Sequence, residues 1–229
     1  FGTGALAGQG IPLGTLLVLG KGRVMEPETD GLPNAELLMQ VYQRLYRRYG
    51  PQGWWPGDGA FDVVVGAILT QAAAWTNVER AIDGMKQAGC WSMRAIHEVP
   101  LEVLASIIRP SGYFNAKARK LKAFAKHLVE GYAGDLSAFL GQEMGPLREE
   151  LLSIHGIGPE TADDILVYAA EKPSFVIDSY TRRIVQRVGL LPQNSKASYR
   201  IYQELFHKNL NKDVSLFNEY HALLDHHAK

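Results

Sequence analysis

The sequence predicts an all-α protein. Apolar residues recur every three to four positions in several long stretches, which is the period of an amphipathic helix. No internal repeat, heptad run or low-complexity segment is found, and no pair of short apolar runs is joined by a convincing β-hairpin turn. Of the 229 residues, 46% are hydrophobic and 21% are charged, which gives ample core for one large unit or two smaller lobes.

Charge and cysteine content narrow the functional classes. Lysine plus arginine equals aspartate plus glutamate at 24 each, so any affinity for nucleic acid must come from a local basic patch. The single cysteine, Cys90, excludes an internal disulfide and a cysteine-based zinc or iron–sulfur site in this chain, and it fits a reducing compartment. No apolar run is long enough to span a bilayer, and the start lacks the basic region of a signal peptide. We therefore expect a soluble, cytoplasmic protein with an irregular N-terminal extension at residues 1–29.

The first predicted helix covers residues 34–48, where apolar side chains recur at helical spacing until Gly50 and Pro51 end it. The loop that follows carries two adjacent tryptophans, Trp54 and Trp55. Large aromatic side chains are normally mostly buried. These two therefore either pack on the core or form a wall on which a base could stack.

Four further stretches follow in order. Residues 61–69 are strongly apolar, and their periodicity fits either a strand or a buried helix. Residues 77–86, 101–107 and 115–132 are predicted as amphipathic helices. The last of these is basic, which indicates either an ordinary solvated helix face or an electrostatic contribution to DNA affinity that falls with salt. Its cationic residues are Lys117, Arg119, Lys120, Lys122 and Lys126.

A helical hairpin is predicted at residues 147–169. An apolar helix face ends at Ile154, Gly156 and Gly158 allow a tight turn, and Pro159 suits the first position of a second helix. The turn leaves backbone N–H groups with no side chain in front of them, so a phosphate oxygen can approach closely. On the turn alone, a plain helical hairpin is an equally good interpretation.

An aspartate follows this hairpin. After a short β-rich run at 174–177, Asp178 is well placed to cap a helix that ends at Gly189. A capping carboxylate accepts backbone N–H bonds that favour its charged form, so we expect Asp178 to be ionised at neutral pH. Two more helices are predicted, over 199–210 and from Ser215 onward.

Several of these motifs resemble one family. The hairpin motif 157–162 and the run 176–178 resemble the helix-hairpin-helix (HhH-GPD) DNA glycosylases of the endonuclease III superfamily. Within that superfamily, residues 54–56 with 66–71, and residues 109–118, are similar to the bacterial 3-methyladenine DNA glycosylase III branch. Each motif is weak alone, but the combination is specific.

The resemblance covers roughly residues 50–190 and implies an all-α, two-lobed helical HhH-GPD DNA glycosylase fold with a cleft between the lobes. It implies that segment 61–69 is a helix. The central lobe would contain residues 60–190 with the helix-hairpin-helix, and both chain ends, residues 30–59 and 190–229, would form the second lobe.

The resemblance also implies site residues. Asp178 would be the catalytic carboxylate, and Gln71 would fill the gap that an extruded base leaves in the duplex. The base pocket would comprise Trp54, Trp55, Pro56, Trp75 and Lys229. The DNA-binding residues would comprise Gln71, His155, Gly156, Ile157, Gly158 and Thr161. No metal is expected on side chains, but hairpins of this family bind a monovalent cation through backbone carbonyls, here those of Leu152, Ile154 and Ile157.

The activity that the resemblance implies is base excision DNA repair. Such an enzyme flips a damaged base out of double-stranded DNA and hydrolyses its N-glycosidic bond. The branch implies alkylated purines such as 3-methyladenine as substrates. Glu160 stands where many relatives have the lysine that attacks the sugar, and a carboxylate cannot form the Schiff base that leads to strand cleavage. We therefore expect a monofunctional DNA glycosylase without AP lyase activity.

No cofactor is expected. Many superfamily members carry a four-cysteine iron–sulfur loop just beyond the position where this sequence stops, so either the protein lacks the cluster, as the glycosylase III branch does, or that end is missing. Two alternatives stay open: an endonuclease III-like glycosylase/lyase for damaged pyrimidines, and a non-catalytic HhH module that binds DNA. We expect a monomeric bacterial protein in the cytoplasm that associates with the nucleoid through its binding to DNA.

Overall fold

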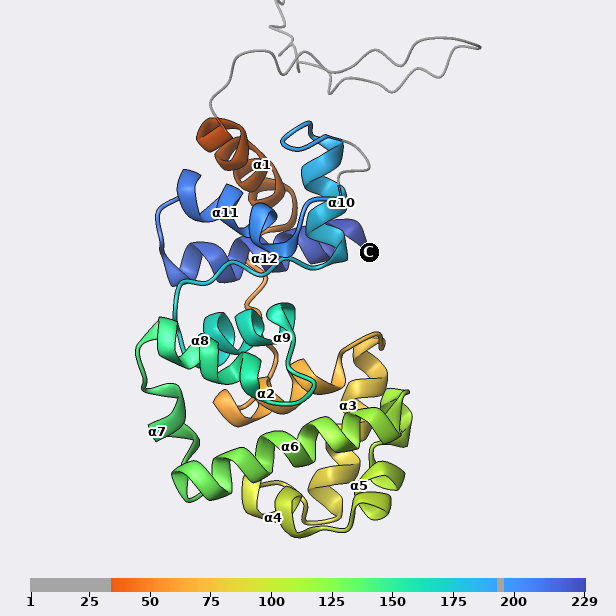
Figure 1. The fold of residues 1–229 in the computed structure, drawn as a ribbon. Coiled ribbons are helices and arrows are strands. Elements are labelled where there is room, and N and C mark those ends of the chain that lie inside the picture. The colour runs from red at the N-terminus through yellow and green to blue at the C-terminus, as the bar shows by residue number, and fades with distance from the viewer. Residues whose placement is uncertain (1–33, 193–195) are drawn as a thin grey trace, which may run out of the picture.

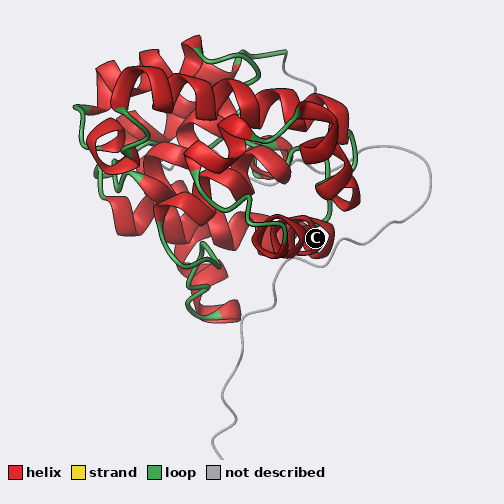
Figure 2. Ribbon diagram, turned by 90° about the horizontal axis from the view of Figure 1, so that it is seen from below, coloured by secondary structure: helices red, strands yellow, loops and turns green. Residues whose placement is uncertain are grey.

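The computed structural model describes residues 34–192 and 196–229, so the predicted extension at 1–29 lies outside the described residues. Within them, all regular secondary structure is helical (Figure 2), which confirms the all-α fold. None of the helices in the described part of the chain combines the length and the apolar character that crossing a membrane requires.

The helices fall into two groups, one above the other in Figure 1. The lower group comprises α2 (Ala60–Leu69), α3 (Trp75–Gln87), α4 (Met93–Glu98), α5 (Leu101–Ile107), the short 3-10 turn η1 (Arg109–Ser111), α6 (Phe114–Tyr132), α7 (Leu136–Leu140), α8 (Met144–Ser153) and α9 (Pro159–Asp164). The π-helical segment η2 (Ile165–Ala169) continues α9. The upper group comprises α1 (Asn34–Tyr49), α10 (Ser179–Arg187), α11 (Tyr199–Asn209) and α12 (Val214–Ala228).

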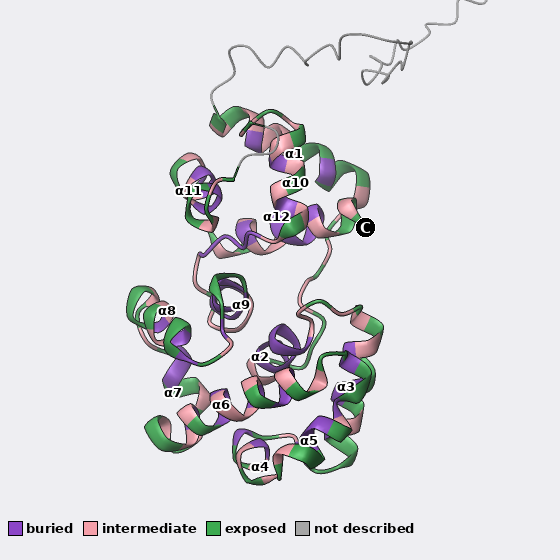
Figure 3. Cartoon of the chain, turned by 45° about the vertical axis from the view of Figure 1, so that its right-hand side comes forward, coloured by how far each residue is buried: buried purple, intermediate pink, exposed green. Residues whose placement is uncertain are grey.

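The first lobe is built around α2. Every residue of α2 from Asp62 to Leu69 is buried, and Figure 3 shows this helix enclosed by its neighbours. The apolar segment 61–69 is therefore a helix that is buried on all sides, as the resemblance implied. This explains why its sequence shows no amphipathic period, because a fully enclosed helix has no polar face.

The second lobe joins segments from both ends of the described chain. Helix α1 packs against α11 and α12, and the Tyr220 hydroxyl donates to the Leu38 carbonyl at 2.8 Å. Phe175 stacks on Phe206 with ring centroids 3.7 Å apart. Because Phe175 and Val185 belong to this second core, the chain changes lobe well before residue 190, where the sequence analysis set the boundary.

The β-rich run 174–177 does not form a strand. It is extended and buried, but its backbone groups bond to side chains of α11 rather than to another strand. The Phe175 N–H donates to His207 Nε2 at 2.9 Å, and the Ile177 N–H donates to the Tyr199 hydroxyl at 3.2 Å. Side-chain partners therefore replace the ladder that a sheet would supply.

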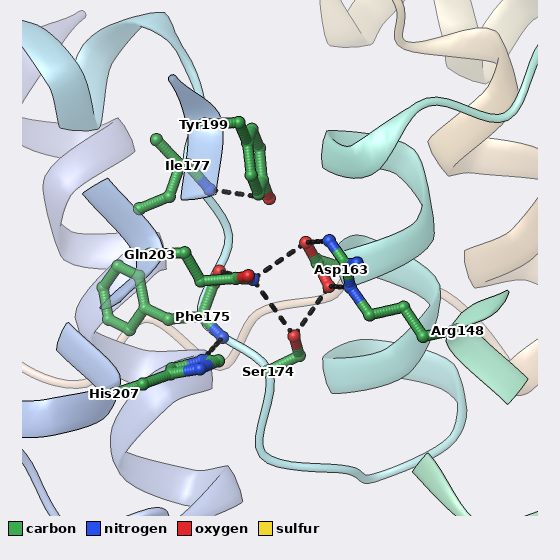
Figure 4. A network of polar contacts seen from close by, with 8 residues as sticks. All are labelled: Arg148, Asp163, Ser174, Phe175, Ile177, Tyr199, Gln203 and His207. Carbon is green, nitrogen blue, oxygen red and sulfur yellow. Dashed lines mark hydrogen bonds and ion pairs between the residues drawn. The ribbon is translucent and has the colours of Figure 1, made fainter. Parts of the chain in front are cut away.

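A buried carboxylate connects the two lobes (Figure 4). Asp163 is fully buried, and Arg148 of α8 donates to both its oxygens, at 2.8 and 3.0 Å. Ser174 donates to Asp163 Oδ1 at 2.7 Å, and Gln203 of α11 donates to Oδ2 at 2.8 Å. The bidentate ion pair raises the pKa of Arg148. This network fixes α9 and the extended run 174–177 against α11.

Candidate active site

A cavity of about 730 Å³ lies where the two lobes meet. Its wall combines the loop after α1, the turn between α2 and α3, α9, the start of α10 and the last turns of α12. The residues that line it are Trp54, Trp55, Thr70, Ala72, Ala73, Ala74, Trp75, Thr76, Glu160, Asp164, Val176, Asp178, Ser179, Tyr180, His221, Asp225 and Lys229.

Asp178 stands in the cavity wall at the N-terminus of α10. Its Oδ1 accepts from the Thr181 N–H at 2.7 Å, which confirms the predicted helix cap. Its other oxygen, Oδ2, lies 4.0 Å from His221 Nε2. The cap orients the carboxylate through a short local bond, and one oxygen stays directed at the cavity side of α12.

Two more carboxylates of α9 lie near Asp178. Burial raises the pKa of Glu160, the negative charge of Asp178 raises it further, and Arg182 opposes both effects. Burial also raises the pKa of Asp164 well above its ordinary value, and the charges of Glu160 and Asp178 add to this. On α12, Asp225 pairs with Lys229 Nζ at 2.6 Å. Acidic side chains therefore outnumber basic ones among the residues that line the cavity.

Three tryptophans also line the cavity. Trp54 and Trp55 are joined by a cis peptide bond, and their ring centroids lie 5.5 Å apart. Trp75 lies 6.0 Å from Trp54 and 5.4 Å from Trp55 by the same measure. Lys229 Nζ lies 5.7 Å from the centre of the Trp54 ring. The structure thus brings together four of the five predicted pocket residues, and the wall interpretation of the paired tryptophans fits this arrangement.

Pro56 is the exception. It is exposed and does not line the cavity, contrary to the predicted pocket. The chain turns back toward α2 directly after Trp55, and the Asp58 N–H donates to Asp62 Oδ2 at 3.1 Å. This turn directs the proline to solvent.

Trp55 depends on a glycine of α2. A Cβ atom at Gly66 would lie 3.0 Å from Cζ2 and 3.1 Å from Nε1 of the Trp55 ring. Only glycine lets the indole lie directly on the helix backbone. This contact gives a physical reason for the glycine in the segment 66–71.

A second hollow, of about 450 Å³, lies at the helical hairpin. It is lined by Gln71, Lys120, Gly156, Ile157, Gly158, Glu160 and Thr161. Gln71 donates to Thr161 Oγ1 at 2.9 Å and accepts a hydrogen bond from Lys120 Nζ. Five of the six predicted DNA-binding residues meet here, whereas His155 is exposed at the hairpin tip outside the lining. Glu160 lines both hollows, so the second hollow, which we call the hairpin groove, adjoins the cavity.

Gly156 has a backbone φ of +86°, a conformation that favours glycine. A Cβ atom there would also lie 2.3 Å from Cγ of Lys120. In the same turn the Ile154 carbonyl accepts from the Ile157 N–H at 3.1 Å. Cation binding by the carbonyls of Leu152, Ile154 and Ile157 stays a prediction.

Several residues of the site could not be recognised from the sequence. Lys120 was assigned only to a basic helix, yet it reaches the hairpin. His221, Asp164 and Tyr168 were not singled out at all. The one available signal was a histidine inside the apolar run of α12, where a buried polar side chain needs a reason.

Comparison with known proteins gives three main similarities. The family model "HhH-GPD superfamily base excision DNA repair protein" matches residues 65–212. A Methanocaldococcus jannaschii protein named as a candidate DNA repair glycosylase is 45% identical over 195 residues, which cover 85% of this chain and 88% of that protein. The structure of H. pylori 3-methyladenine DNA glycosylase bound to 1,N6-ethenoadenine has a TM-score of 0.72 and 25% identity, covering 85% of this chain and 96% of that one.

A trapped endonuclease III–DNA covalent intermediate has a TM-score of 0.71 at 18% identity, covering 84% of this chain and 85% of that one. The fold of the present chain is therefore one that other proteins use in complex with DNA.

Proposed function

Since this chain belongs to the HhH-GPD superfamily of base excision DNA repair proteins, we propose that it is a monofunctional glycosylase for alkylated purines, with 3-methyladenine as the model substrate. Its family and fold make it a base excision DNA glycosylase that binds DNA. The lesion it removes and the absence of a lyase step are the parts that we propose.

One observation carries the choice of lesion: three tryptophans and four carboxylates line one cavity. In a nucleotide that is methylated at N3 of adenine or N7 of guanine, the purine base carries a positive charge. Such a base gains cation–π stacking from the indole faces and electrostatic attraction from the ionised carboxylate of Asp178. A neutral base gains only the stacking. The cavity therefore favours charged alkylated purines over neutral lesions.

The chemical step needs little help from an acid. When the C1′–N bond breaks, its electron pair passes to the base nitrogen and neutralises the positive charge that the base already carries. The sugar then has oxocarbenium character. An ionised Asp178 stabilises that charge and accepts the proton of the water that adds to C1′.

The hairpin groove would hold the strand while the base occupies the cavity. Gly156 and Gly158 line the same hollow as Lys120, so backbone N–H groups and a positive charge are available there to a phosphate. Gln71 stands between groove and cavity, and Ala72 directly after it has a left-handed backbone (φ 52°). Extrusion costs a few kcal/mol, which contacts of this kind can offset.

The alternative glycosylase/lyase needs an amine at C1′. Among the described residues, Lys229 is the lysine that lines the cavity, and its amine is ion-paired with Asp225. An amine held in this way lacks the free lone pair that attack on C1′ requires. Glu160 offers no amine either.

The decisive experiment is release of free base from methylated duplex DNA, with strand breaks scored before and after alkali. We expect the wild type to release 3-methyladenine and to give breaks only after alkali. Asp178→Asn should reduce release by about 100-fold or more. The matched control is Asp213→Asn, because Asp213 caps α12 in the same way, accepting from the Leu216 N–H at 2.7 Å, but does not line the cavity.

Each result decides a separate point. No release by the wild type would refute the substrate assignment, and breaks without alkali would favour the glycosylase/lyase. Undiminished release by Asp178→Asn would remove Asp178 from the mechanism. Binding of DNA with no release of any damaged base would favour the non-catalytic module.

A further inference from the structure

His221 is a buried histidine in the cavity wall that the mechanism above does not use. It lies on α12, is only 7% exposed and lines the cavity beside Asp178. Its Nδ1 lies 2.6 Å from the Tyr168 hydroxyl. Its Nε2 is buried without any hydrogen-bond partner and lies 4.0 Å from Asp178 Oδ2. An unpartnered buried nitrogen costs stability, so it calls for an explanation.

The contact with Tyr168 determines which nitrogen carries the proton. Burial raises the pKa of Tyr168 well above its ordinary value, so the hydroxyl keeps its proton. The other acceptor near that hydroxyl, the Asn218 carbonyl, is 3.5 Å away, whereas Nδ1 is at 2.6 Å. The hydroxyl therefore donates to Nδ1, and the proton of a neutral imidazole is on Nε2. In this tautomer the Nε2–H of His221 points toward the carboxylate of Asp178. In the other tautomer the Nε2 lone pair would point toward that carboxylate, which is repulsive.

The surroundings of His221 contain several charges. Burial lowers the pKa of His221, the carboxylates of Asp178 and Asp225 oppose this, and Lys229 adds to it, so the ring is neutral at neutral pH. The titratable and charged groups that face His221 and Asp178 are Tyr168 on η2, Glu160 and Asp164 on α9, Arg182 on α10, and Asp225 and Lys229 on α12.

Three carboxylates compete in this space. Glu160, Asp164 and Asp178 repel one another, so ionisation of all three at once is disfavoured. Asp178 receives the Thr181 N–H and faces the His221 N–H, whereas no hydrogen-bond donor is found for the carboxylate of Asp164 within the described residues. The donors therefore favour charge on Asp178.

We propose that His221 is a positioning residue for Asp178, and that its Nε2–H, oriented by Tyr168, keeps the negative charge of the acidic cluster on Asp178 rather than on Glu160 or Asp164. The separation of 4.0 Å exceeds a hydrogen bond, and such contacts commonly tighten when substrate binds. A shift of about 1 Å closes it. His221 transfers no proton; it sets which carboxylate faces the developing charge at C1′.

The test is single-turnover base release as a function of pH, and it rests on the proposed function. His221→Leu removes the donor, and Tyr168→Phe removes the hydroxyl that orients it. For both variants we expect the acid limb of the rate profile to move up by about one to two pH units, with activity recovering at alkaline pH. His221→Gln, whose amide nitrogen can take the place of Nε2, should shift the limb less. His127→Gln is the control, because His127 bonds Glu150 away from the cavity.

A second measurement separates this inference from the proposed function. Nitrogen NMR of the DNA-free protein, with the signal assigned through His221→Gln, should show His221 neutral with the proton on Nε2, and Tyr168→Phe should weaken that preference. A proton on Nδ1, or a loss of activity equal at every pH in His221→Leu, would overturn the positioning role. If the wild type releases no base at all, the proposed substrate fails, and the NMR result alone decides the orientation of His221.

Discussion

Asp164 has a predictable effect on stability, because it is buried beside two other carboxylates. Its pKa is raised in the folded protein, mainly by burial, so between its ordinary pKa and the raised one the folded state binds more protons than the unfolded state. The free energy of unfolding therefore falls as pH rises through that window. Asp164→Asn does not titrate, so we expect it to raise the melting temperature at pH 7 and to lose this advantage near pH 4.

Thermal unfolding at a series of pH values measures this effect. Asp213→Asn provides a baseline, because it changes a helix-cap aspartate outside the cavity. An advantage of Asp164→Asn that is equal at pH 4 and pH 7 would contradict the assignment.

Residue roles were predictable where their cause is local. Asp178 could be predicted as a helix cap because its partner, Thr181, is three positions away. His221 could not, because its partner Tyr168 is 53 positions away and its neighbour Asp178 lies on another helix. Spacing along a sequence carries no signal for such contacts.

At the scale of elements, the hairpin gives the sharpest prediction. Gly156→Ala must hold a left-handed backbone and push Lys120 aside, so we expect a loss of about 1–3 kcal/mol in the free energy of unfolding. Gly158→Ala meets nothing within 4 Å and has an ordinary φ of −92°, so its stability should change by less than about 0.5 kcal/mol. Its methyl group would nevertheless stand before the groove and weaken DNA binding several-fold.

Chemical denaturation together with fluorescence anisotropy on duplex DNA tests this pair. The two variants serve as controls for each other. Gly156→Ala tests the strain of the left-handed backbone, and Gly158→Ala tests whether a phosphate approaches the turn. Equal stability losses in both variants would show that steric strain is not specific to Gly156. Unchanged affinity in Gly158→Ala would show that phosphate does not approach this part of the turn.

Long helices were predicted better than short ones. The helix predicted over 34–48 corresponds to α1. It could be predicted because five apolar positions recur at helical spacing along one face. Helices α4 and α7 were not predicted, although Ser92 and Asp135 cap them, because six and five residues are too few to show a period. The β-rich run 174–177 is extended without forming a strand, because side chains of α11 bond its backbone, and propensity says nothing about such partners.

At the scale of the whole molecule, the Asp163 network predicts how firmly the lobes are joined. Asp163→Ala leaves the buried amide of Gln203 and the partly exposed guanidinium of Arg148 without their shared acceptor, so we expect a loss of about 3 kcal/mol in the free energy of unfolding. Glu204→Ala removes two exposed ion pairs, with Arg200 and Lys208, and should change stability far less. Denaturant titration measures both, and similar losses would contradict the role of the buried network.

The two-lobed fold followed from motif resemblance, but the boundary between the lobes did not. The family motifs lie mostly in the first lobe and at Asp178, so they identify the cleft. The motifs do not reveal that Phe175 and Val185 belong to the core of the second lobe. That assignment depends on contacts with Phe206 and other residues of later helices.

The bond between Tyr220 and Leu38 joins residues 182 positions apart. At ordinary rates of protein synthesis, α1 waits roughly ten to forty seconds for the helix that covers its apolar face. His221 and Asp225, which line the cavity from α12, are synthesised within the same interval. A growing chain thus completes the helical hairpin at 147–169 before α12 closes the cavity, so base excision becomes possible only after that helix has packed against α1.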